Sequence, residues 1–168
     1  MRDFRRALKG GSVLIFDGGM GSLLQRRGLQ AGQSPEEFGM RRPEVVAEIH
    51  AEYARAGALV VTKNTFGATR YKLPSSLDVV KVTETMARTA RQAVGEGVFV
   101  AGSVGPTGKM IAPLGDKTFR ELVEVFKEQI RGLAAGGVDL VLAETHFDLA
   151  EARAVVVAAR EVCDLPVG

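Results

Sequence analysis

The chain has 168 residues, of which 46% are apolar and 25% are charged, and this composition is that of an ordinary folded protein rather than a disordered one. A net charge of +2, with the basic excess near the start of the chain, provides no basic surface for nucleic acid or anionic lipid. The single cysteine allows no intramolecular disulfide, and no apolar stretch reaches the roughly 18 residues of a membrane span. We therefore expect a cytoplasmic protein with no nucleic-acid or membrane partner.

Short apolar runs alternate with helical patterns along the whole chain, after an amphipathic lead-in over residues 1–12. The apolar runs end in polar or glycine-containing loops, which is typical of buried parallel strands. A short helix with Ser22 as its N-cap follows the first run, and longer helices follow the next three. The predicted strands are 13–16, 59–62, 98–103, 140–144 and 165–167, and the predicted longer helices are 43–57, 79–95, 118–136 and 148–163. Thr118 with Glu121, and Asp148 with Glu151, are predicted capping boxes at the starts of the last two helices.

The ends of the first four strands recur at roughly 40-residue intervals, which indicates a repeated βα unit. Such a repeat fits either an open doubly wound sheet or part of a (β/α)8 barrel. Both architectures place ligands at the carboxyl ends of the strands, so we expect the candidate site there. The strand-end residues are Asp17, Thr62, Ser103 and Glu144.

Two glycine-rich loops could bind an anion. The loop after the first strand leads from Asp17 into a helix whose free N–H groups could receive a carboxylate or a phosphate. The alternative is a tight βα turn in which Asp17 only caps the backbone. A dinucleotide site fits poorly because Leu24 occupies the place of the third small residue, and the loop 102–109 fails as a phosphate loop because Met110 follows it.

Glu144 ends an otherwise apolar strand, where a carboxylate needs a cation or a hydrogen-bonding partner. We favour a ligand ammonium over an internal network. Asn64 holds the matching place after the second strand, although it could equally bond loop backbone. His50 is predicted to be a packed helix residue and Cys163 a small buried one, and His146 has no partner at metal-ligand spacing, so no metal site is predicted in this chain.

Taken together, these loops resemble the homocysteine S-methyltransferase family, and within it the homocysteine-binding module of cobalamin-dependent methionine synthase. The resemblance is carried by five stretches in the family's order. They are 17–25 (DGGMGSLLQ), 43–57 (PEVVAEIHAEYARAG), 64–73 (NTFGATRYKL), 102–116 (GSVGPTGKMIAPLGD) and 137–151 (GVDLVLAETHFDLAE).

The resemblance implies a (β/α)8 barrel that binds homocysteine at its C-terminal face, with the sulfur on a zinc ion held by three cysteines. Methylcobalamin, betaine or another donor would supply the methyl group. Asp17 and Gly18 would contact the amino acid, and the backbone N–H groups of Gly21 and Ser22 would receive its carboxylate. Glu144 would accept the ammonium, with Asn64 and Ser103 lining the pocket.

The chain departs from the family pattern mainly in length, because the zinc cysteines of the family follow later strands and Cys163 matches none of them. Lys63, directly before Asn64, is a smaller departure that could change the contacts made by the loop after the second strand. We therefore predict that residues 1–168 form one domain, the first four βα units of the barrel. This half-barrel would carry half of the amino-acid pocket and be inactive alone. The alternative is a non-catalytic half-barrel that assembles with itself or with another chain.

Overall fold

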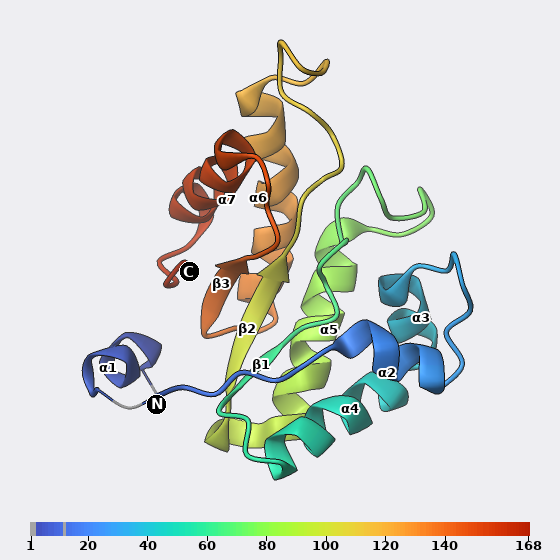
Figure 1. Ribbon diagram of the computed structural model, residues 1–168, viewed down its shortest axis with the longest axis vertical. Helices are drawn as coiled ribbons and strands as arrows, with labels where there is room; N and C mark the ends of the chain where they lie inside the picture. Colours follow the sequence, from blue (N-terminus) through green and yellow to red (C-terminus); the bar gives the residue numbers. More distant parts are fainter. Residues whose placement is uncertain (1–2, 12) are drawn as a thin grey trace.

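A computed structural model describes residues 3–11 and 13–168 of the chain. Helices dominate it and surround a small parallel sheet (Figure 1). In chain order the elements are α1 (Phe4–Lys9), α2 (Met20–Arg26), α3 (Pro35–Arg41), α4 (Pro43–Arg55), β1 (Val60–Thr62), α5 (Val79–Val94), the 3-10 helix η1 (Gly95–Gly97), β2 (Phe99–Val104), α6 (Phe119–Ala135), β3 (Leu140–Ala143) and α7 (Leu149–Val162).

The three strands lie side by side in the order β1-β2-β3, all parallel. Val61 pairs with Val100, and Ser103 pairs with Leu142, so the carboxyl ends of the strands meet at one edge of the sheet. Each strand is followed by a helix, as the alternation of apolar runs and helical patterns predicts. This edge is where Ser103 and the residues after β1 and β3 come together.

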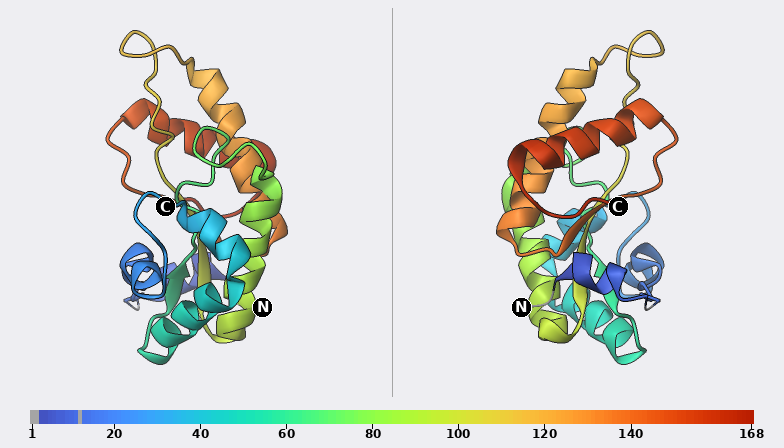
Figure 2. Two further views of the ribbon diagram at one scale, coloured as in Figure 1. Left: turned by 90° about the vertical axis from the view of Figure 1, so that its right-hand side faces the viewer. Right: turned by 90° about the vertical axis from the view of Figure 1, so that its left-hand side faces the viewer.

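Helices α4, α5, α6 and α7 pack against one another in chain order and cover one face of the sheet. The larger core lies between this helix layer and the strands and includes Val61, Val100, Phe126 and Leu133. The opposite face carries a smaller apolar cluster against which the Phe4 ring packs, with its centroid 5.2 Å from that of Phe99. Figure 2 shows α1 in front of the strands and α5 behind them in its right-hand view.

The helix predictions are confirmed, because local apolar spacing and caps specify these elements. Thr118 and Glu121 form the predicted capping box at the start of α6. The second predicted capping box is wrong in part: Asp148 accepts from the Ala150 N–H, but the Glu151 carboxylate bonds Thr107 instead. Within the predicted lead-in, α1 is helical, and residues 1, 2 and 12 lie outside the described part of the chain.

The predicted outer strands 13–16 and 165–167 are wrong as full strands. Each contributes one isolated parallel bridge, Phe16 to Val60 and Val167 to Val141. A strand needs neighbours to satisfy its backbone groups, and these two segments each pair on one side only among the described residues. In that same part of the chain, no helix is long and apolar enough to cross a membrane.

Candidate functional site

Asp17 joins the first apolar segment to β1. Its carboxylate accepts hydrogen bonds from the Thr62 N–H at 2.8 Å and from the Thr62 hydroxyl at 2.9 Å. Burial raises the pKa of Asp17 to about 6, and the nearby charge of Glu144 adds to the rise, while the two bonds from Thr62 oppose it. The carboxylate therefore bonds the end of β1 instead of capping its own βα turn, and it is held within electrostatic reach of Glu144.

We expect the Asp17 carboxyl to titrate near pH 6. The folded form holds this proton more tightly than an unfolded chain, so Asp17 contributes stability at low pH that is lost as the pH rises from about 4 to about 6. Carbon-13 NMR of the aspartate carboxyls should give a midpoint near 6 in the native chain. Glu144→Gln should lower this midpoint because it removes a neighbouring negative charge. A midpoint near 4 in both proteins would contradict the raised pKa.

Glu144 and Ser103 form the centre of the predicted site. Ser103 is a buried residue of β2, and its hydroxyl donates a hydrogen bond to one carboxylate oxygen of Glu144, which directly follows β3. Glu144 is only partly buried, and its carboxylate makes no ion pair with any described cationic residue. The carboxylate therefore has an internal hydrogen-bonding partner but no internal cation.

The first turn of α2 follows Asp17 closely in the sequence but is capped differently from the prediction. The N-cap is Gly19, so Ser22 as N-cap is wrong; Ser22 lies inside the helix, and its hydroxyl reaches the Gly19 carbonyl at 3.4 Å. The consecutive small residues allow the helix to begin earlier than the serine. Gly21 and Ser22 still lie in the first turn, where backbone N–H groups lack a partner within the helix, and both are exposed.

Gly18 is required by close packing at the same turn. A Cβ atom at this position would lie 2.9 Å from the Tyr53 hydroxyl oxygen, which itself donates to the Gly19 carbonyl at 3.3 Å. Any larger residue would displace this ring and the turn with it. The turn that presents the α2 N–H groups is thus fixed by α4.

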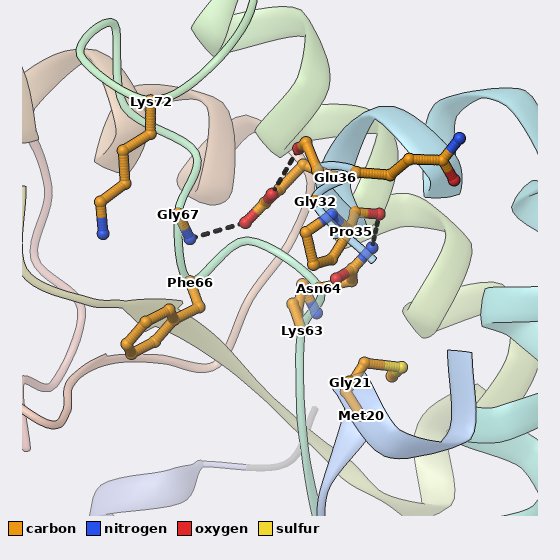
Figure 3. Close-up of a pocket in the computed structure, with 12 residues that line it drawn as sticks. Met20, Gly21, Gly32, Pro35, Glu36, Lys63, Asn64, Phe66, Gly67 and Lys72 are labelled. Atoms are coloured by element: carbon orange, nitrogen blue, oxygen red, sulfur yellow. Dashed lines mark hydrogen bonds between the residues drawn. The ribbon is translucent and has the colours of Figure 1, made fainter. Parts of the chain in front are cut away.

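Asn64 bonds backbone, which was one of the two roles expected for it from the sequence. Its side-chain amide donates to the Pro35 carbonyl at 2.6 Å, so it binds α3 to the loop after β1 (Figure 3). Asn64 also lines a cavity of about 550 Å³ together with Gly21, Phe66 and Lys72. This cavity adjoins the first turn of α2 and does not include the side chains of Asp17, Ser103 and Glu144.

Helix α3 and its buried Glu36 were not predicted from the sequence. One Glu36 oxygen accepts from the Gly67 N–H at 2.6 Å, and the other accepts from the Ser34 hydroxyl at 2.8 Å (Figure 3). Glu36 thereby holds the loop after β1 against α3. The signal was present in the run 34–37, where a serine N-cap precedes a proline and two acidic residues, as at many helix starts.

The remaining predicted residues behave as packing groups. His50 is buried in α4, and burial, with a smaller effect from Lys63, lowers its pKa to about 3. Cys163 is partly buried at the C-terminal end of α7. Within residues 3–11 and 13–168, no three His, Cys, Asp or Glu side chains are placed to hold a metal ion. These residues do not fit a zinc site, and we derive no step through zinc from them.

A family model and solved structures both match most of this chain. A model of the homocysteine S-methyltransferase family matches residues 14–168. The chain is similar to the metallated form of the homocysteine methyltransferase MmuM from Escherichia coli, at 23% identity and a TM-score of 0.80. It is similar to the oxidized form of that protein at 24% identity and a TM-score of 0.83.

The two alignments cover 96% of this chain but only 64% and 63% of the respective MmuM chains. The chain therefore spans less than two thirds of the length of these structures. At this identity the likeness establishes the fold, and the parallel sheet with its helix layer is a partial (β/α) barrel. Of the two folds that the sequence allowed, the barrel type is confirmed.

Proposed function

The chain belongs to the homocysteine S-methyltransferase family, and from this premise we propose that it forms the amino-acid-binding half of an enzyme that methylates homocysteine to methionine. The observation that carries the proposal is the pair of carboxylates, Asp17 and Glu144, at the same edge of the sheet, with the exposed first turn of α2 directly after Asp17. Negative side chains suit an ammonium, and free N–H groups suit a carboxylate.

In this proposal the Glu144 carboxylate, oriented by the Ser103 hydroxyl, binds the substrate ammonium. Asp17 adds negative charge at the same edge of the sheet, and the N–H groups of Gly21 and Ser22 bind the substrate carboxylate. Gly18 and Asn64 shape the walls, through Tyr53 and Pro35 respectively. These contacts would orient the amino acid and leave its thiol free for the part of the barrel that this chain does not cover.

The reaction is a transfer of a methyl group to sulfur. The thiol loses its proton, a sulfur electron pair forms the new S–C bond, and the bond between the methyl carbon and the donor breaks with its electrons leaving on the donor. We propose that the zinc ligands and the site for the donor, methylcobalamin or another, belong to the part of the barrel that this chain does not cover. The chain alone would then bind the amino acid without methylating it.

Binding by this chain tests the proposal. L-homocysteine and 4-sulfanylbutanoate, which lacks only the ammonium, should be titrated against the 168-residue chain by calorimetry. The proposal expects the amino acid to bind more tightly than the analogue, because only the amino acid can engage Glu144 and Asp17. Equal affinity for the two compounds would argue against an ammonium site at these carboxylates.

The alternative function is assembly of a non-catalytic half-barrel, and exposed apolar residues beside the sheet favour some form of association. The side chains of the first apolar segment include Val13, which is 82% exposed, and Ile15, which is 58% exposed. Together with the single-sided pairing of Phe16, they leave an apolar edge that a neighbouring strand and helix would cover. We propose the missing C-terminal half-barrel as the natural occupant, and a second copy as its substitute when this chain is alone.

The isolated chain should therefore self-associate, and the double variant Val13→Lys with Ile15→Lys should shift it toward monomer because it places charges on the apolar edge. Leu114→Lys is the matched control, since Leu114 is 79% exposed in the loop between β2 and α6. Sedimentation velocity over a range of concentrations measures the distribution. A native chain that stays monomeric at high concentration would contradict this prediction.

A further inference from the structure

Glu144 is followed by a residue with an unusual backbone conformation. Thr145 has a φ of 63°, and it is the only residue other than glycine with a positive φ in the described part of the chain. Such a conformation persists in a threonine only where surrounding contacts hold it. The contacts that hold this turn therefore also decide where the preceding carboxylate lies.

The His146 ring supplies one of these contacts. Its Nε2 atom lies 3.2 Å from the Val104 carbonyl oxygen, which also accepts the backbone N–H of Glu144 at 3.1 Å. A carbonyl oxygen can only accept, so Nε2 carries a proton and donates. Both sides of Thr145 are thus tied to the end of β2, one residue beyond the Ser103 hydroxyl that holds the Glu144 carboxylate.

Glu151 and Phe126 pack against the rest of the ring. Its carboxylate lies 3.5 Å from His146 Nδ1, and its second oxygen accepts from the Thr107 N–H at 2.8 Å and from the Thr107 hydroxyl at 2.5 Å. Glu151 is 1% exposed and the His146 side chain 4% exposed. The Phe126 ring of α6 packs edge-on against the imidazole, with ring centroids 6.1 Å apart. His146 Nδ1 makes no hydrogen bond to any described residue, so on this side the ring is held by close packing in a buried site.

We propose that His146, packed between Phe126 and Glu151 and bonded to the Val104 carbonyl, is a positioning residue that fixes the Glu144 carboxylate for the ammonium of the amino acid. The inference rests on the proposed function. His146 does not touch the ligand; it acts through the turn at Thr145 and the shared Val104 carbonyl. Loss of its hydrogen bond to that carbonyl frees the turn, and the carboxylate then samples positions outside the reach of the ammonium.

The test measures affinity for L-homocysteine and for 4-sulfanylbutanoate in the 168-residue chain. His146→Leu and His146→Asn remove the donor that reaches Val104, whereas His146→Gln can restore it with its longer amide. The expected result is about a tenfold loss of homocysteine affinity in the first two variants, no change for the analogue, and recovery in His146→Gln. His50→Leu, which alters the other histidine of the chain, should leave both affinities unchanged.

Combination with Glu144→Gln separates positioning from general packing. If His146 acts through Glu144, His146→Leu should cause no further loss in the Glu144→Gln background. Circular dichroism selects the folded variants, and either His146→Leu or His146→Asn is sufficient for the comparison. Equal losses for both ligands, or additive losses in the double variant, would overturn the positioning role. A native chain that does not prefer homocysteine over the analogue would overturn the proposed function itself, and this inference with it.

Discussion

Glu144→Gln is expected to weaken homocysteine binding by about 10- to 150-fold, because a hydrogen bond to a charged group contributes roughly 1.5 to 3 kcal/mol. The variant removes the negative charge and keeps a side-chain oxygen that can accept from Ser103, so the local structure should survive. Calorimetric titration measures the change, and 4-sulfanylbutanoate should bind the variant as it binds the native chain.

Glu96→Gln is the matched control for this substitution. Glu96 is an exposed carboxylate in η1, which precedes β2 and so lies at the opposite end of the sheet from the strand tips. Glu96→Gln should leave the affinity for homocysteine unchanged. Undiminished homocysteine affinity in Glu144→Gln, or the same loss in Glu96→Gln, would show that Glu144 does not bind the ammonium.

Lys63→Met is expected to stabilise the fold by about 1 to 3 kcal/mol, which is the cost of burying a polar group without a partner. Lys63 is 2% exposed, and its amine has no hydrogen-bond partner among the described residues. Burial lowers the pKa of this amine well below its usual value, with the charge of Arg91 as a smaller cause. The unfolded chain therefore binds a proton that the folded chain does not hold as tightly.

The effect of pH on this variant follows from the difference between the pKa of Lys63 in the folded and the unfolded chain. Since the folded pKa is lowered, the cost of Lys63 is present at neutral pH and disappears as the pH rises toward 10.5, the pKa of an unperturbed lysine. Urea unfolding at pH 7 and pH 10 should thus give a larger gain for Lys63→Met at pH 7. Lys81→Met, at an exposed position of α5, should change little. A destabilised Lys63→Met would show that the amine has a stabilising partner.

The helix layer was predictable because its determinants are local. Apolar spacing and end signals specify α4, α5, α6 and α7, and the start of α6 at Thr118 agrees with its capping box. The extent of the outer strands was not predictable, because strand pairing depends on segments that are distant in the sequence. Phe16 and Val167 each have a strand neighbour on one side only in the described chain. A short apolar run indicates where a strand can form, but it does not indicate whether adjacent strands of the sheet are there to pair with it.

The candidate site was predictable at the level of position and less so at the level of contacts. The strand-end rule placed Asp17, Ser103 and Glu144 at one edge of the sheet before the register was known. It did not reveal that Asp17 bonds Thr62 or that Asn64 bonds Pro35, since these contacts join segments far apart in the sequence.

The most direct test of the account is a nitrogen-15 NMR titration of the 168-residue chain with L-homocysteine. The account predicts saturable shifts of the backbone amides of Gly18, Gly21, Ser22 and Glu144, which come from the first turn of α2 and the end of β3. Shifts that are absent at these amides, or that are confined to the outer surface of the helix layer, would contradict the assignment of the strand ends as the homocysteine site.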